Sequence, residues 1–156
     1  MSESGMRERV VRMLSPVGGI AVENPALPGT PDVNYTLGWV ELKWLRSWPV
    51  GEATPVVIDH FTPQQRIWHI NRRRCGGRSH VLIQCRREWV LLDGIDAALH
   101  LNQVDRSALI KLATWYWNGG LNQKELLACL LSEPRPVTLD GEDGETLRQL
   151  LAKGTV

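Results

Sequence analysis

The amino-acid sequence predicts an α/β protein, because segments with helical and with strand patterns follow one another along the chain. Residues 5–14 carry apolar side chains at helical spacing, residues 33–35 and 39–45 are β-prone runs at hairpin distance, and residues 62–65 form a strong helix start. With 156 residues, of which 43% are hydrophobic and 22% charged, the chain is typical of one compact domain. We therefore expect residues 1–156 to form a single domain.

The first elements are a helix, a short strand and a hairpin. Ser4 is the expected cap of the helix over residues 5–14, and residues 20–22 form a short strand. The runs 33–35 and 39–45 are separated by Thr36-Leu37-Gly38, a connection of hairpin length that contains glycine. These assignments predict a hairpin over residues 33–45.

A second helix begins at Thr62, with Pro63 in its first turn and Gln65 completing a capping box, and it ends near Cys75. The connection over residues 47–60 is long for a compact domain, which is typical of functional or partner-binding loops. Strands are expected next at 81–84 and 89–92, followed by helices over about 105–117, from Asn122 onward, and over 146–153.

Charged side chains gather on one face of the second hairpin strand. Since successive side chains of a strand point to opposite faces, Glu41 and Lys43 point the same way, about 6.6 Å apart along the strand. Val40 and Leu42 point to the core. Counting back through the turn pairs Asp32 with Leu42 or Lys43, so Asp32 is expected to lie beside the two charged residues.

Two carboxylates that meet at a strand end form a hard oxygen site suited to Mg²⁺ or Mn²⁺. Hydrolysis of a phosphodiester bond needs such a site, since the metal lowers the pKa of its water and offsets charge on the phosphate. Lys43 can orient the water or neutralise the phosphate. Taken singly, Asp32 is explained as a turn residue and Glu41 and Lys43 as a solvated strand face.

In this order the residues resemble the PD-(D/E)xK nuclease superfamily, with Pro31-Asp32 as the first half of the motif and Glu41-Leu42-Lys43 as the second. The resemblance is nearer to its VRR-NUC and Holliday-junction-resolvase-like branches and covers residues 5–93. It implies a restriction-endonuclease-like αβββαβ core with a mixed central sheet. Residues 94–156, which match no family pattern, are expected to form a helical C-terminal extension.

The resemblance also implies further site residues. An acidic residue of the first helix joins the metal site in this family, and Glu8 matches that position, with Glu3 and Glu23 as competitors. A glutamine early in the helix after the motif matches Gln65, for which the capping box is a sufficient explanation too. The expected metal ligands are Asp32, Glu41, the Leu42 carbonyl and Glu8.

Arginines are concentrated after the motif. Between Phe61 and Arg87 no acidic residue interrupts seven arginines, which are Arg66, Arg72, Arg73, Arg74, Arg78, Arg86 and Arg87. An exposed helix face explains them in part, but such a block is also what a phosphate-binding surface requires. We expect it to bind DNA without sequence preference. Trp48, in the long loop, is a candidate for contact with DNA or a partner subunit.

The expected function is that of a Mg²⁺-dependent DNA endonuclease, with Mn²⁺ able to substitute, acting on branched DNA such as Holliday junctions as a homodimer. The alternatives are a nuclease acting on flaps, ends or single strands, and a catalytically silent nucleic-acid-binding assembly protein. Without a transmembrane segment, a signal peptide or a GxxxxGK[ST] loop, we expect no membrane, no nucleotide cofactor, and a cytoplasmic location, or a viral protein in the host cytoplasm.

Overall fold

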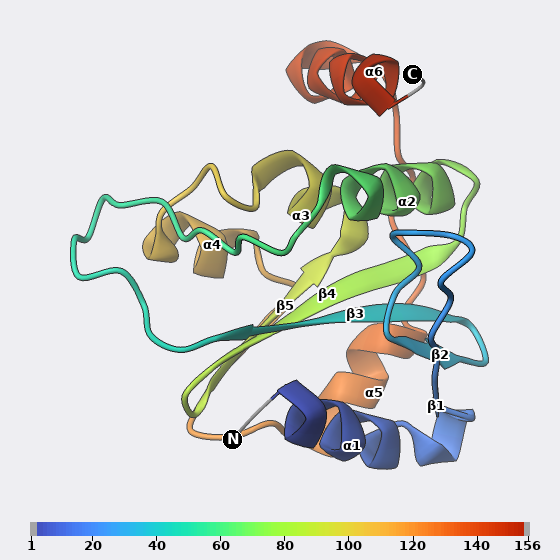
Figure 1. Cartoon of the computed structure of the whole chain (residues 1–156), viewed down its shortest axis with the longest axis vertical. Helices are drawn as coiled ribbons and strands as arrows, with labels where there is room; N and C mark the ends of the chain where they lie inside the picture. The colour runs from blue at the N-terminus through green and yellow to red at the C-terminus, as the bar shows by residue number, and fades with distance from the viewer. Residues whose placement is uncertain (1–2, 155–156) are drawn as a thin grey trace.

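The computed structural model describes residues 3–154 and is built around one six-stranded mixed sheet (Figure 1). The strands lie side by side in chain order, and they are β1 (Ile20–Ala21), β2 (Val33–Tyr35), β3 (Gly38–Leu45), β4 (Arg78–Cys85), β5 (Glu88–Asp93) and β6 (Trp115–Asn118). The β3–β4 pair is parallel and the other pairs are antiparallel. The expectation of an α/β protein with a mixed sheet is confirmed.

Helices cover both faces of this sheet. One face carries α1 (Glu3–Met13), the 3₁₀ turn η1 (Ser15–Val17) and α5 (Gln123–Leu131), while the other carries α2 (Pro63–Arg74), α3 (Gly94–His100) and α4 (Arg106–Leu112), with α6 (Gly141–Gly154) packed outside α2 and α3 (Figure 1). A parallel connection needs a crossover, and α2 provides it between β3 and β4. Within residues 3–154, no helix has the length and apolar character to cross a membrane.

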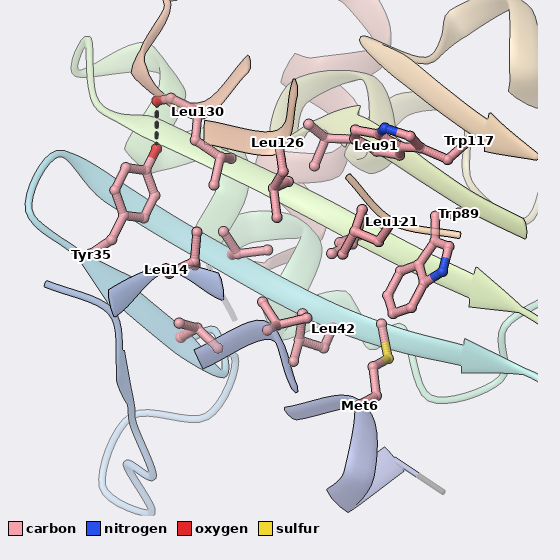
Figure 2. Packing of buried hydrophobic residues seen from close by; sticks show 14 residues of the cluster. Met6, Leu14, Tyr35, Leu42, Trp89, Leu91, Trp117, Leu121, Leu126 and Leu130 are labelled. Atoms are coloured by element: carbon pink, nitrogen blue, oxygen red, sulfur yellow. Dashed lines mark hydrogen bonds between the residues drawn. The ribbon is translucent and has the colours of Figure 1, made fainter. Parts of the chain in front are cut away.

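Two cores follow from the alternation of side chains along the strands. Leu42 and Val40 of β3 pack with Met6 on the face that α1 and α5 cover. At the edge of this core, the Tyr35 hydroxyl group donates a hydrogen bond to the carbonyl of Leu130 at 2.8 Å (Figure 2). On the opposite face the central strands pack against Phe61 and the residues of α3 and α4. Strands buried on both faces are typical of a sheet between two helical layers.

Two local predictions are wrong in the region after β5. The helix expected over 105–117 ends at Leu112, because Trp115–Asn118 is a β-prone aromatic segment that pairs with β5 and buries Trp117. The extension over 94–156 is therefore not purely helical. A short helix, α3, starts directly after β5, where the Asp93 side chain accepts a hydrogen bond from the backbone of Ile95.

Smaller differences concern the first helix and the strand lengths. Helix α1 already includes Glu3, so Ser4 lies inside it instead of capping it. Strands β4 and β5 are longer at both ends than expected, since both are buried along most of their length. The second helix is confirmed with its capping box at Thr62 and its end at Arg74.

Candidate active site

The hairpin of β2 and β3 places Asp32 at the site. Tyr35 pairs with Gly38 across a two-residue turn, and Val33 pairs with Val40, so the register continues to set Asp32 opposite Glu41. The predicted pairing with position 42 or 43 is wrong, because it assumed a three-residue turn. The Asp32 side chain nevertheless reaches Leu42, whose backbone N–H donates to Oδ2 at 2.8 Å.

Glu41, Lys43 and Gln65 form one buried hydrogen-bonded group between β3 and α2. The Lys43 Nζ lies 3.0 Å from Glu41 Oε1 and donates to Gln65 Oε1 at 3.1 Å. It also donates to the His60 carbonyl at 3.0 Å. The Gln65 amide nitrogen donates to Glu41 Oε1 at 3.0 Å. The prediction that Glu41 and Lys43 share a face is confirmed, but this face is covered by α2 and is not solvated.

Gln65 caps α2 and contacts the site at the same time. Its Oε1 accepts a hydrogen bond from the backbone of Thr62 at 3.0 Å, while its own backbone N–H donates to the Thr62 hydroxyl at 3.2 Å. The capping box therefore holds the Gln65 amide in the orientation that meets Glu41 and Lys43. The sequence left open whether Gln65 caps the helix or contacts the site, and its side chain does both.

A close backbone contact brings the Asp32 loop to the start of α2. Gly29 has φ 96°, and a Cβ at this position would lie 2.6 Å from the carbonyl oxygen of Gln64. Only glycine combines this backbone conformation with such an approach. The Gly29 contact fixes the loop that ends in Asp32 against the helix that carries Gln65.

The Glu41 carboxyl group is short of favourable partners. Its side chain is 3% exposed, and Oε2 has no hydrogen-bond partner, although it is buried. Burial, the largest cause, and the negative charge of Asp32 together raise the pKa of Glu41 to about 8, against the opposing effect of Lys43. A second cation beside Oε2 would satisfy this oxygen and lower the pKa.

Helix α1 contributes Glu3 and Arg7 to the site, whereas Glu8 lies elsewhere. Glu3 and Arg7 are four residues apart and so share one side of the helix. The Glu3 carboxylate lies 3.1 Å from His60 Nε2, and an Arg7 nitrogen lies 3.4 Å from Asp32 Oδ1. Glu8 is exposed and lines a separate hollow with Arg12. The buried positions Met6 and Val10 fix this rotation of the helix.

These side chains surround a cavity of about 410 Å³. Its lining comprises Glu3, Ser4, Met6, Arg7, Asp32, Glu41, Leu42, Lys43, His60 and Gln65. Sequence reasoning missed Arg7 and His60. The spacing of Arg7 four residues after Glu3 was the available signal for the first, whereas the position of His60 depends on how the 47–60 loop folds back.

The oxygen atoms at this cavity fit a hard divalent cation. Within residues 3–154, no three or more His, Cys, Asp or Glu side chains are grouped closely enough to hold a metal. The donors here are two carboxylates and a carbonyl. Because the N–H and C=O of a strand residue point to the same edge, the Leu42 carbonyl faces the edge at which its N–H meets Asp32. The unpartnered Glu41 Oε2 is the atom that such an ion would satisfy.

The seven arginines do not form one continuous surface. Arg73 is 2% exposed, pairs with Asp93 at 2.8 Å and donates to two backbone carbonyls, so it does not belong to an exposed arginine surface as expected. Arg66 donates to carbonyls near the end of α3 and stacks on Phe61. These two arginines stabilise the packing of α2.

The exposed members of the set lie at two ends of the sheet. Arg72 and Arg74 are exposed near the C-terminal end of α2, where Arg72 lies 4.7 Å from the ring centre of Trp68. Arg86 and Arg87 are exposed at the β4–β5 turn. The intervening strand β4 spans about 26 Å at roughly 3.3 Å per residue. Arg78 is half-buried and donates to the carbonyl of Ser132.

Trp48 is anchored within the protein. Its indole N–H donates to Glu88 Oε2 at 2.7 Å, and its ring packs under Arg106 and against the second core. The long loop is thus fixed to the sheet at its beginning.

Comparison of the chain with protein-family models, curated proteins and solved structures finds no match.

Proposed function

We propose that this protein is a metal-dependent nuclease that hydrolyses phosphodiester bonds of DNA at the cavity between β3, α1 and α2. The observation that carries the proposal is the buried, unpartnered Oε2 of Glu41 beside the carboxylate of Asp32. A fold that needed Glu41 only for packing would satisfy both of its oxygens, since a buried unpaired carboxylate oxygen is costly. The order of helix, three strands, helix and strand from α1 to β4 agrees with the core that the resemblance implies.

Asp32, Glu41 and the Leu42 carbonyl would hold Mg²⁺, or Mn²⁺ in its place. When bound, the ion supplies Lewis acidity that activates water and offsets charge on the phosphate. The carboxylates orient this centre, since the Leu42 N–H fixes Asp32 and Gln65 fixes Glu41. Glu3, which lines the cavity, takes the place that the sequence assigned to Glu8.

Lys43 would orient the attacking water or neutralise the phosphate. Its ammonium group is held by Glu41, Gln65 and the His60 carbonyl at the cavity wall. A fixed cation beside the reacting group costs little reorganisation during the reaction. Lys43 is 2% exposed, which strengthens its electrostatic effect relative to a solvated lysine.

DNA is the proposed substrate, with branched DNA as the first structure to test and a homodimer as the proposed assembly. The exposed Arg72 and Arg74 before β4 and Arg86 and Arg87 after it offer phosphate contacts at the two ends of this strand. Separated contacts of this kind fit a substrate that extends across the protein more readily than a mononucleotide.

Cleavage of a four-way junction, flapped, linear and single-stranded DNA in Mg²⁺, Mn²⁺ or EDTA tests the proposal. We expect metal-dependent cleavage by the wild-type protein and a loss of at least about a thousandfold in Asp32→Ala and Lys43→Ala, because several kcal/mol of transition-state stabilisation depend on such a centre. Both variants should fold and bind DNA. Gel filtration gives the oligomeric state.

The exposed residue Lys124, at the start of α5, offers a matched control. Lys124→Ala removes the same charge as Lys43→Ala and should retain full cleavage. Wild-type protein that binds DNA and cuts none of the four substrates with either ion would instead favour a catalytically silent DNA-binding protein. Full activity in Asp32→Ala would contradict the assignment of the site.

A further inference from the structure

Arg7 lines the cavity, and its guanidinium group is held mainly by the segment that follows β1. One of its terminal nitrogens donates to Glu23 at 3.1 Å, and the other donates to the Val22 carbonyl at 3.1 Å. The contact to Asp32 is longer, at 3.4 Å, and involves only one carboxylate oxygen. The guanidinium position is therefore set by the segment after β1, and Asp32 is its weakest partner.

The guanidinium group keeps hydrogen-bonding capacity beyond its contacts with Val22, Glu23 and Asp32. Arginine has five N–H donors in a fixed planar arrangement, and three hydrogen bonds are formed here. The Arg7 side chain is 30% exposed, and it lines the same cavity as Asp32 and Glu41. A partly exposed guanidinium group with spare donors, in a cavity lined by two carboxylates, suits an anion that enters together with a cation.

Lys43, the other permanent cation in the described lining, has no such capacity. An ammonium group has three N–H donors, and Lys43 directs them to Glu41, Gln65 and the His60 carbonyl. It can act on a phosphate through its charge, but a direct hydrogen bond would require it to release one of these partners. Arg7 can form such a bond without leaving its Val22 and Glu23 contacts.

We propose that Arg7 is the residue that binds the phosphate group of the substrate in this cavity, exchanging its long contact with Asp32 for hydrogen bonds to phosphate oxygens. The proposal rests on the nuclease function proposed above and names a binding residue for it. A guanidinium group matches two phosphate oxygens at once, which fixes the orientation of the phosphate as well as its position. Arg7 would act in binding, while Asp32 becomes free to hold the metal ion.

Calorimetric titration with thymidine 3′,5′-bisphosphate in the presence of Ca²⁺ tests the role of Arg7 without measuring cleavage. We expect Arg7→Ala to weaken binding of this probe by about tenfold to a hundredfold, the range for a lost hydrogen bond to a charged group. Arg7→Lys keeps the charge but not the planar pair of donors, so it should lie between Arg7→Ala and the wild type. In cleavage, Arg7→Ala should raise KM more than it lowers kcat.

Two variants separate phosphate binding from a structural role. Arg12→Ala removes an exposed arginine of the same helix that lies outside the cavity, and it should bind the probe like the wild type. Glu23→Gln removes the Arg7–Glu23 ion pair but keeps the guanidinium group. If Arg7 only anchored the segment after β1, Glu23→Gln and Arg7→Ala would both lose thermal stability and probe binding. If Arg7 binds phosphate, Glu23→Gln should bind the probe within about threefold of the wild-type affinity, a difference below 1 kcal/mol.

The outcomes distinguish this proposal from the proposed function. Loss of probe binding in Arg7→Ala alone supports the role of Arg7, even if the wild-type protein cuts no DNA. Equal binding by Arg7→Ala and the wild type overturns it, as does a wild-type protein that fails to bind the probe at millimolar concentration. In both of these cases the cleavage panel with Asp32→Ala and Lys43→Ala still decides the nuclease function.

Discussion

Glu41 and Glu88 are both glutamates of the central sheet with little exposed surface, but their carboxylate oxygens differ in hydrogen-bond partners. The Oε1 of Glu88 accepts hydrogen bonds from Arg106 and Tyr116, and its Oε2 accepts one from Trp48 at 2.7 Å. Those partners belong to α4, β6 and the long loop, so Glu88 connects three segments to the start of β5.

The Glu41 carboxyl group has its partners on one oxygen only. Oε1 contacts Lys43 and Gln65, each at 3.0 Å, whereas Oε2 is buried without a hydrogen bond. The nearby charge of Asp32 adds to the cost of ionising the Glu41 carboxyl group. A fold gains nothing from this arrangement, since the unpaired oxygen has lost its water without gaining a protein donor.

Acid–base properties follow the same division. Burial acts to raise the pKa of Glu88, but hydrogen bonds from Tyr116, Trp48 and Arg106 outweigh it and lower the pKa below the usual value. Burial and the Asp32 charge raise the pKa of Glu41 to about 8. The protein satisfies both oxygens of Glu88, whereas it leaves Oε2 of Glu41 without a hydrogen bond. Under the proposed function, Glu88 is a structural carboxylate and Glu41 a functional one.

The same substitution at both positions should therefore have opposite consequences. Glu41→Gln should lower cleavage by at least about a thousandfold, as expected for a lost metal ligand, and change the free energy of unfolding by less than about 1 kcal/mol. Glu88→Gln should lower the free energy of unfolding by about 1–2 kcal/mol, through weakened charge-assisted hydrogen bonds, and leave cleavage by the folded protein unchanged. Urea unfolding and cleavage rates measure the two effects.

The reverse result would remove the distinction between these glutamates. If Glu41→Gln unfolded the protein while Glu88→Gln abolished cleavage, the catalytic centre would lie near α4 and β6 instead of the Asp32 cavity.

Gln65 and Thr62 offer a comparison within one capping box. Gln65→Glu keeps an acceptor for the Thr62 backbone but replaces the donor to Glu41 by a negative charge, so cleavage should fall by about ten- to a hundredfold with little change in stability. Thr62→Ala removes the cap and should cost about 1 kcal/mol of stability with cleavage retained. Equal activity of the two variants would show that Gln65 serves the helix alone.

The raised pKa of Glu41 makes metal binding depend on pH. Between the usual glutamate pKa of 4.5 and about 8, Glu41 keeps its proton in the folded metal-free protein, whereas the unfolded chain has lost it. This group therefore contributes to stability at low pH, and the contribution is lost as the pH rises through about 8. A divalent ion must displace this proton. Metal affinity should therefore rise by up to about tenfold per pH unit between pH 6 and 8.

Calorimetry in buffers of different ionisation enthalpy would detect the released proton, and Glu41→Gln should release none at this position. A metal affinity that stays constant from pH 6 to 8 in the wild-type protein would contradict a protonated Glu41 in the metal-free state.

Local patterns predicted the elements around the site well. The hairpin, the capping box at Thr62 and the helix that opens at Asn122 all depend on short-range hydrogen bonding and were expected near their observed positions. The segment 115–118 was missed because its pairing with β5 is a long-range interaction that overrides a helical reading of the neighbouring residues.

The site was predictable where one hairpin determines it and not where separate segments meet. The alternation along β3 placed Glu41 and Lys43 together, and the turn brought Asp32 to them with an error of one residue. The rotation of α1 depends on how Met6 and Val10 pack on the sheet, so the sequence favoured Glu8 over Glu3. The arginines were separated by burial that a sequence block does not reveal, as in the case of Arg73.

Direct titration with Mn²⁺, followed by the loss of its free-ion electron paramagnetic resonance signal, tests the central claim that the Asp32–Glu41 cavity is a metal site. We expect the wild-type protein and Glu88→Gln to bind Mn²⁺ equally, and Asp32→Asn and Glu41→Gln to bind it at least about tenfold more weakly, since each loses a ligand. Equal Mn²⁺ binding by the wild type and both site variants, or no binding by the wild type, would contradict the account.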